Sequence, residues 1–255
     1  MDLGIRGRVA LVTGASSGIG EAVALALAAE GVKLAVAARR GDRLETVARE
    51  AKRRGAADAR PVELDLEKSD SIQNALRAAR DALGEIDILV ANSGGPKPGT
   101  YLDLKLDDWD GGYRGVLRSI LELVYGAVPA MRSRKWGRIV ALTSSSVKQP
   151  IPNLTLSNAF RTALTAALKT LSLEVARDGV TVNAIATGRV LTDRLRKLYP
   201  DTVALEKAAQ ADVPIGHVAS PDEFAPMVAF LCSEPARYVT GQTIAIDGGL
   251  IRSLY

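Results

Sequence analysis

The sequence predicts an α/β fold, a single domain in which helices flank a doubly wound sheet of seven parallel strands. Short apolar runs alternate with longer segments of helical period, and the runs are apolar throughout, as strands covered on both faces require. The chain has 255 residues, 47% of them hydrophobic, which is enough for one large core. Because no internal repeat or low-complexity linker interrupts the alternation, residues 1–255 are expected to form one domain.

The expected strands are brief and mostly aliphatic. They are Val9–Val12, Leu34–Ala38, Val62–Leu64, Ile86–Ala91, Ile139–Leu142, Val180–Ile185 and Thr243–Ile246. The expected helices lie between them and are Glu21–Glu30, Arg43–Arg54, Ser69–Leu83, Trp109–Arg134 and Ser157–Arg177. Residues 189–218 break the pattern, because they are polar and highly charged and lie between the sixth and seventh strands. A doubly wound sheet binds its ligand near this position, so this segment is expected to be a substrate lid.

Charge and composition exclude several classes of protein. The net charge of +4 is spread along the chain, which is too weak for nucleic-acid binding. No apolar run is long enough for a membrane span, and Met1–Arg8 lacks the apolar core of a signal peptide. Cys232 is the only cysteine, so no internal disulfide can form. We therefore expect a cytoplasmic protein with no nucleic-acid or membrane partner and no metal site.

A glycine-rich turn between the first strand and an alanine-rich helix predicts a dinucleotide site. Glycines let the backbone approach a pyrophosphate, whose charge is stabilised by the amides at the helix N-terminus. The alternative is a glycine turn kept only for packing. The residues expected to contact the dinucleotide here are Gly14, Ser16, Ser17, Gly18, Ile19 and Gly20.

The end of the second strand favours NADP(H) over NAD(H). An NAD site usually has an acidic residue there for the ribose 2′-hydroxyl, but this strand ends in Arg39 and Arg40. A guanidinium can bind the 2′-phosphate through two hydrogen bonds. The alternative is that both arginines only face water. Asp65 and Leu66, after the third strand, are expected beside the adenine, although Asp65 could equally be a turn residue.

Three further motifs resemble those of the short-chain dehydrogenase/reductase family. Asn92-Ser93-Gly94-Gly95 is similar to its Asn-Asn-Ala-Gly motif, Asn183–Gly188 to its Asn-x-x-x-Pro-Gly segment, and Asp247-Gly248-Gly249 to its C-terminal signature. The resemblance covers essentially the whole chain and implies a Rossmann-type sheet and a homo-oligomer, either a tetramer or a dimer. It also implies dinucleotide contacts by Asn92, Ser93, Gly94, Gly188 and Thr192.

The family's active site usually contains an asparagine, a serine, a tyrosine and a lysine, and only the serine is retained here. Spacing places the serine at Ser144, the tyrosine at Ser157 and the lysine at Arg161. The asparagine position falls on Val116. Serine is too weak an acid to replace the tyrosine, and arginine, with a pKa above ~12, cannot donate its proton usefully.

The remaining residues suggest how part of the chemistry could survive. Arg161 can bind the nicotinamide ribose as the lysine would, and Ser144 can polarise a substrate carbonyl. Tyr113, which shares a helix face with Val116, is the first candidate for a displaced proton donor, ahead of Lys97 and Lys148. Each of the three could instead be a structural or solvated side chain.

Two functions remain open from the sequence. The first is an NADP(H)-dependent oxidoreductase that reduces a small-molecule carbonyl or oxidises an alcohol, with an atypical active site. The second is a non-catalytic NADP-binding scaffold or sensor. Basic residues in the expected lid could attract an anionic substrate such as a coenzyme A thioester, although a solvated helix face explains them equally well. His217 in the lid is expected to be structural.

Overall fold

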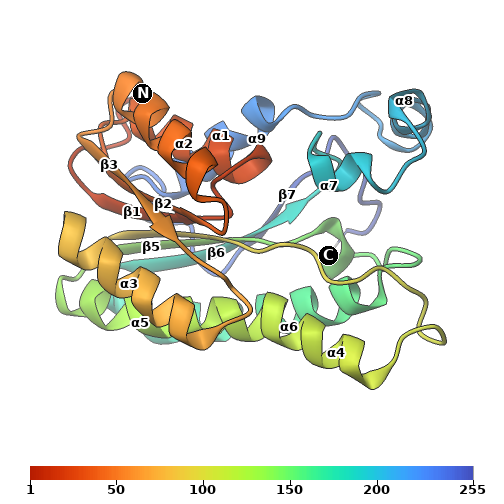
Figure 1. Cartoon of the computed structure of the whole chain (residues 1–255), viewed down its shortest axis with the longest axis horizontal. Helices are drawn as coiled ribbons and strands as arrows, with labels where there is room; N and C mark the ends of the chain where they lie inside the picture. The colour runs from red at the N-terminus through yellow and green to blue at the C-terminus, as the bar shows by residue number, and fades with distance from the viewer. Residues whose placement is uncertain (255) are drawn as a thin grey trace.

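A parallel sheet of seven strands runs through the middle of the protein (Figure 1). The computed structural model describes residues 1–254. Its strands are β1 (Val9–Thr13), β2 (Lys33–Ala38), β3 (Asp58–Glu63), β4 (Ile88–Asn92), β5 (Gly137–Leu142), β6 (Val180–Thr187) and β7 (Thr243–Ile246). They are hydrogen-bonded in the order β3-β2-β1-β4-β5-β6-β7, which reverses between β1 and β4. The expected Rossmann-type fold class is thereby confirmed.

Helices cover both faces of the sheet. The α-helices are α1 (Gly18–Ala29), α2 (Gly41–Arg53), α3 (Ser69–Leu83), α4 (Leu106–Gly112), α5 (Ser119–Ser133), α6 (Thr155–Val175), α7 (Asp193–Arg196), α8 (Thr202–Asp212) and α9 (Pro221–Leu231). Shorter helical turns are η1 (Tyr113–Arg118), η2 (Ser145–Val147) and η3 (Ala176–Asp178). Helices α1, α2 and α9 lie on one face, and α3, α5 and α6 lie on the other (Figure 1).

Successive residues of one strand contribute to two separate cores. Val12 belongs to the apolar cluster under α1, α2 and α9, whereas its neighbour Leu11 belongs to the cluster under α3, α5 and α6. Both side chains are fully buried. This two-sided burial explains why the strand sequences are apolar throughout instead of alternating with polar residues.

The observed elements differ from the expected ones in several places, and α7, α8 and α9 correspond to no expected helix. Strand β3 begins at Asp58, four residues before the expected start at Val62, because it is an edge strand in which only Ala59 and Val62 are buried. Its first residues therefore lack the apolar run of the inner strands. The long helix expected over Trp109–Arg134 begins at Leu106 and contains a π-helical turn, η1. Single π-turns within helices occur frequently at functional sites.

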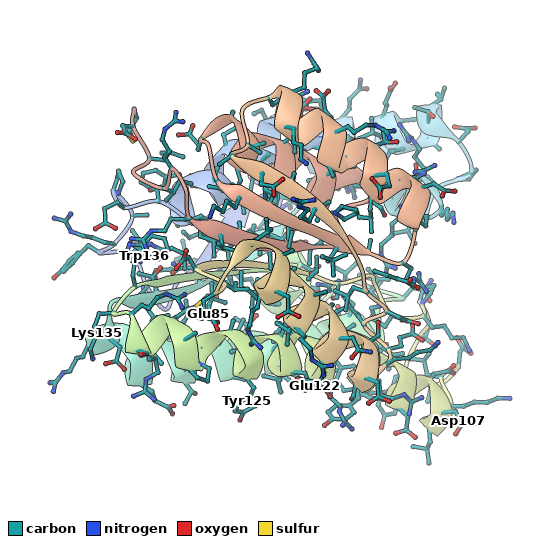
Figure 2. The ribbon with its side chains drawn as sticks, turned by 60° about the vertical axis from the view of Figure 1, so that its left-hand side comes forward. Glu85, Asp107, Glu122, Tyr125, Lys135 and Trp136 are labelled. Atoms are coloured by element: carbon teal, nitrogen blue, oxygen red, sulfur yellow. The ribbon has the colours of Figure 1, made fainter. Side chains whose placement is uncertain are left out.

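Some large apolar side chains remain exposed on the outer helices. Tyr125 on α5 is 79% exposed and projects away from the sheet (Figure 2), and Leu173 on α6 is 74% exposed. Between residues 1 and 254, no helix is both long enough and apolar enough to cross a membrane.

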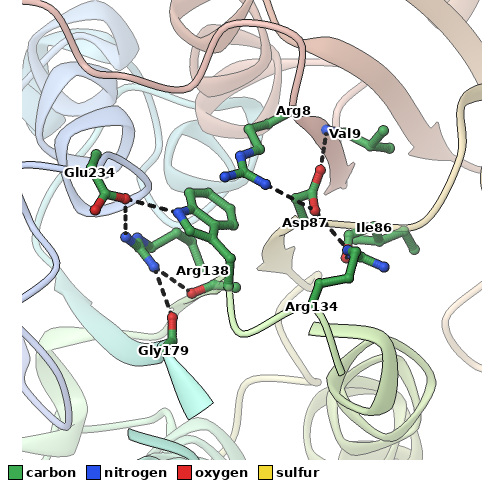
Figure 3. Close-up of polar contacts among 10 residues, drawn as sticks. Arg8, Val9, Ile86, Asp87, Arg134, Arg138, Gly179 and Glu234 are labelled. Carbon is green, nitrogen blue, oxygen red and sulfur yellow. Dashed lines mark hydrogen bonds and ion pairs between the residues drawn. The ribbon is translucent and has the colours of Figure 1, made fainter. Parts of the chain in front are cut away.

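A buried arginine joins three segments at the end of the sheet opposite the strands' carboxyl ends (Figure 3). Arg138 of β5 donates hydrogen bonds to the backbone oxygens of Gly179 and Ser233 and to the carboxylate of Glu234, at 3.2, 2.9 and 3.0 Å. The same carboxylate accepts a hydrogen bond from the indole of Trp136 at 2.9 Å. Because Arg138 is only 1% exposed, Glu234 is the group that neutralises a charge held away from water.

We therefore expect Glu234→Ala to lower the free energy of unfolding by about 1–3 kcal/mol, since a buried donor would lose its charged partner. Urea denaturation measures this loss. Glu234→Gln keeps an acceptor and should lose less, and Glu45→Ala, at an exposed site on α2, serves as the control. A Glu234→Ala protein as stable as the control would contradict this account of Arg138.

Candidate active site

The carboxyl ends of the strands open into one large cavity of about 940 Å³. Its walls come from the loops after β1, β2, β3, β4, β5 and β6, and from the segment that contains α7. This is the edge at which the strand order reverses between β1 and β4, where open α/β sheets bind ligands. The cavity brings together every residue predicted from the sequence to contact the dinucleotide except Gly20, which lies behind the loop.

The glycine-rich turn forms a closely packed cradle at one end of this cavity. Gly14 and Gly18 have φ of +62° and +59°, in the left-handed region that favours glycine. A Cβ at Gly20 would lie 2.3 Å from the carbonyl oxygen of Gly14, so the strand and helix approach too closely for a side chain. Ser17, the N-cap of α1, makes no side-chain hydrogen bond to the first turn. The amides of that turn are therefore available to a phosphate group, and the cradle fits a dinucleotide.

Arg40 lies over the cradle and is bonded to it. Its guanidinium donates hydrogen bonds to the hydroxyls of Ser16 and Ser17, at 2.8 and 2.7 Å from Nη2. Arg39 also lines the cavity but makes no comparable contact among the described residues. Strand β2 ends without a carboxylate at this position. Arg40 and the two serines together form a group of donors suited to a phosphate.

The loops after β3, β4 and β6 complete the cradle. One carboxylate oxygen of Asp65 accepts a hydrogen bond from the amide of Glu67, so this residue does form a turn, yet it still lines the cavity. Asn92 is fixed through its backbone, which exchanges two hydrogen bonds with the hydroxyl of Thr13 at 2.8 and 2.9 Å. Thr192 lies close to Gly18, since an added Cβ there would come within 3.0 Å of its methyl group.

Ser144, Ser157 and Arg161 line the other end of the cavity. The Oγ of Ser144 accepts a hydrogen bond from the amide of Ser146 at 3.1 Å, which leaves its hydroxyl proton free to point at a ligand. Ser157 and Arg161 are one turn apart on α6 and are 5% and 7% exposed. The structure therefore brings together the three residues that spacing selected.

Arg161 is a buried charge without a carboxylate partner among residues 1–254. Its Nη1 and Nη2 donate hydrogen bonds to the backbone oxygens of Leu142 and Gly94, at 2.9 and 3.1 Å. Burial, and secondly the nearby charge of Arg194, lower the pKa of Arg161 to about 10. Two of its five N–H groups are satisfied by the protein, so the others remain for a ligand.

The other candidate proton donors lie away from this end of the cavity. Tyr113 is 43% exposed and packs against Phe160, outside the cavity wall. Lys97 forms an ion pair with Asp108, and Lys148 is not part of the wall. His217 contacts Glu223. The geometry therefore does not support Tyr113, Lys97 or Lys148 as displaced acids.

Residues from the expected lid line the cavity in a way that sequence spacing did not identify. The wall includes Arg189, Arg194 and Tyr199, although no regular motif links them to Ser144. Arg194 lies directly on the backbone of Gly95, from the loop after β4. The basic composition of residues 189–218 was the available signal, but only folding shows which of these side chains face the cavity.

Comparison with known proteins agrees with this geometry. A family model described as Enoyl-(Acyl carrier protein) reductase matches residues 14–251. The chain belongs to the short-chain dehydrogenase/reductase family. It is 33% identical to the 3-oxoacyl-[acyl-carrier-protein] reductase FabG of Aquifex aeolicus over 252 residues, which cover 98% of this chain and 100% of the relative. The corresponding enzyme of Salmonella typhimurium is 35% identical over 250 residues, with 97% and 99% covered.

Solved structures of short-chain dehydrogenases and reductases superpose closely on this one. L-sorbose reductase from Gluconobacter frateurii, complexed with NADPH and L-sorbose, has a TM-score of 0.94 at 34% identity, with 100% of both chains covered. YwfH, an NADPH-dependent reductase involved in bacilysin biosynthesis, has a TM-score of 0.92 at 28% identity, with 97% of this chain and 100% of YwfH covered. This short-chain dehydrogenase/reductase is thus an oxidoreductase of the NAD(P)-dependent type.

Proposed function

We propose that this short-chain dehydrogenase/reductase reduces the carbonyl group of a small molecule and uses NADPH to do so. The observation that carries the proposal is that the phosphate cradle, the hydroxyl of Ser144 and the buried guanidinium of Arg161 line one continuous cavity. The dinucleotide supplies a hydride when it is bound. The rest of the chemistry is stabilisation of the charge that develops on the carbonyl oxygen.

Ser144 and Arg161 are suited to that stabilisation. The bond from the Ser146 amide orients Ser144, so its hydroxyl can donate to the oxygen that becomes negative as the hydride reaches the carbonyl carbon. Arg161 provides positive charge at the same end of the cavity, in a setting where low polarity strengthens its effect. Ser144 is too weak an acid, and Arg161 acts in its charged form, so water protonates the alkoxide to give the alcohol.

The preference for NADPH rests on Arg40. Its guanidinium is held above the cradle by Ser16 and Ser17, where a ribose 2′-phosphate would replace or join the serine hydroxyls as acceptor. No carboxylate ends β2 to bind a free 2′-hydroxyl. NADPH-bound relatives such as L-sorbose reductase support the same choice.

The first experiment is NADPH oxidation by the purified protein over a panel of ketones, diketones and 3-oxoacyl thioesters. We expect turnover, and we expect Ser144→Ala to reduce kcat by about 10²–10³-fold through loss of a donor to the developing oxyanion. Saturable NADPH binding without turnover on any substrate would instead support an NADP-binding scaffold or sensor.

Arg40→Ala should weaken NADPH binding by at least about 10-fold and leave NADH binding nearly unchanged, since a charge-assisted bond to the 2′-phosphate contributes roughly 1.5–3 kcal/mol. Fluorescence titration measures both constants. Arg49→Ala, at an exposed site on α2 outside the cavity, is the matched control. Equal losses for the two dinucleotides would remove Arg40 as the basis of the preference.

The pH dependence should differ from that of an enzyme with a titrating phenol. Arg161 keeps its charge below its lowered pKa of about 10, so kcat/KM for a neutral ketone should stay level from about pH 6.5 to 9 and fall as pH rises through 10. Steady-state rates across this range test the expectation. A clear titration between pH 6.5 and 9 would mean that a side chain supplies the proton, and Tyr199 would then be the first phenol to substitute.

We further propose a homo-oligomer, a dimer or a tetramer. Tyr125 and Leu173 leave apolar area exposed on neighbouring helices, and β7 is a half-exposed edge strand of apolar sequence. Edge strands and apolar patches of this kind are usually covered by a partner. Native mass spectrometry should detect a dimer or tetramer. Tyr125→Glu and Leu173→Glu should each shift the distribution of oligomeric states toward smaller species. A wild-type monomer at micromolar concentration would refute this.

A further inference from the structure

A pair of arginines converges on the reactive end of the cavity. Arg161 lines it from α6, and Arg194 lines it from α7. Their proximity is seen in two ways. Arg161 donates to the oxygen of Gly94 while Arg194 rests on the next residue, Gly95, and the charge of Arg194 contributes to the lowered pKa of Arg161.

The loop after β4 is shaped to receive Arg194. A Cβ at Gly95 would lie 1.7 Å from Cζ of Arg194 and about as close to both terminal nitrogens, so any side chain there would displace the guanidinium. The only hydrogen bond that Arg194 makes within the described residues is a long one, 3.4 Å, to the oxygen of Pro96. The guanidinium is therefore placed by packing, with most of its donors unused.

No carboxylate of the described chain neutralises this pair. Asp193 and Asp212 also line the cavity, but Asp193 is bonded to Arg196 and Asp212 to Arg189. Nη1 of Arg189, the third arginine in this wall, is buried with no hydrogen-bond partner among residues 1–254. Like charges held together in a partly desolvated site repel one another until an anion binds between them.

We propose that Arg194 and Arg161 form a carboxylate-binding subsite and that the substrate is a small oxo acid whose carboxylate lies a few bonds from its carbonyl group. A guanidinium matches a carboxylate through two parallel hydrogen bonds, which suits Arg194. The depth of Arg161 requires the anion to be close to the reacting carbon. A coenzyme A thioester carries its charges on distant phosphates, so it does not meet this requirement.

This inference rests on the proposed reductase activity, and its test compares each acid with its own ester. The probes are pyruvate, acetoacetate and levulinate with their methyl esters, each reduced with NADPH. We expect kcat/KM to favour at least one acid over its ester by about 10–100-fold, the range of a charge-assisted hydrogen bond. The chain length of the preferred acid reports how far the subsite lies from the carbonyl.

Arg194→Met should abolish that preference by lowering kcat/KM for the acid far more than for the ester, and Arg194→Lys should retain part of it. Gly95→Ala is a second route to the same result, because it displaces the guanidinium without removing it. Lys197→Met is the matched control, since Lys197 follows α7 directly and is a cation that does not line the cavity.

A binding measurement separates this proposal from the proposed function. Calorimetric titration of the same acids and esters into protein loaded with NADP⁺ requires no turnover, since the oxidised dinucleotide carries no hydride to transfer. If the acids bind, if Arg194→Met removes this binding, and if the protein reduces none of them, the subsite proposal stands and the proposed reductase activity is refuted.

Acids that bind and react no better than their esters would overturn the subsite proposal. So would an Arg194→Met protein with weakened NADPH binding and an unchanged acid preference, because Arg194 would then serve the dinucleotide pyrophosphate.

Discussion

The arrangement of the candidate active site depends on one buried positive charge, that of Arg161. A guanidinium that is 7% exposed and has no carboxylate partner among the described residues is stable only where the backbone supplies acceptors. The oxygens of Leu142, at the carboxyl end of β5, and of Gly94, in the loop directly after β4, do so. The position of the charge is therefore set by the parallel sheet, which ends both strands at the same edge.

Under the proposed function, that constraint determines what Ser157 and Arg161 contribute as a pair. A tyrosine and a lysine at these positions would combine a proton donor with a cation that lowers its pKa. A serine and an arginine give up the proton donor and keep the cation. The arginine can hydrogen-bond and stabilise negative charge over a wide pH range, so the site is suited to electrostatic stabilisation of an alkoxide more than to acid catalysis. Val116 fits the same trend, because it places an apolar side chain where a polar one is usual in the family.

The cradle at the other end of the cavity depends on close backbone approach. A Cβ at Gly20 would clash with the carbonyl oxygen of Gly14, and a Cβ at Gly14 would clash with Asn92, whose backbone is held by Thr13. These contacts fix the amides of α1 toward the cavity. Between the two ends, the segment with α7 contributes Thr192 beside the cradle and Arg194 beside Arg161. A single short segment thus connects dinucleotide binding with the charge at the reactive end.

The sequence by itself determined the fold class, the seven strands, the phosphate loop and the positions of Ser144, Ser157 and Arg161, because these depend on local periodicity and fixed spacing. The sequence placed the start of β3 four residues too late, since an edge strand with only two buried residues lacks a continuous apolar run. Only the tertiary structure decided that Tyr113 packs against Phe160 outside the cavity, and that Arg194 lies on Gly95 next to Arg161. The physical reason is that these contacts join segments about 50 to 100 residues apart in the sequence. The direction of an irregular or short helical segment is set by the residues that it packs against and not by its own sequence.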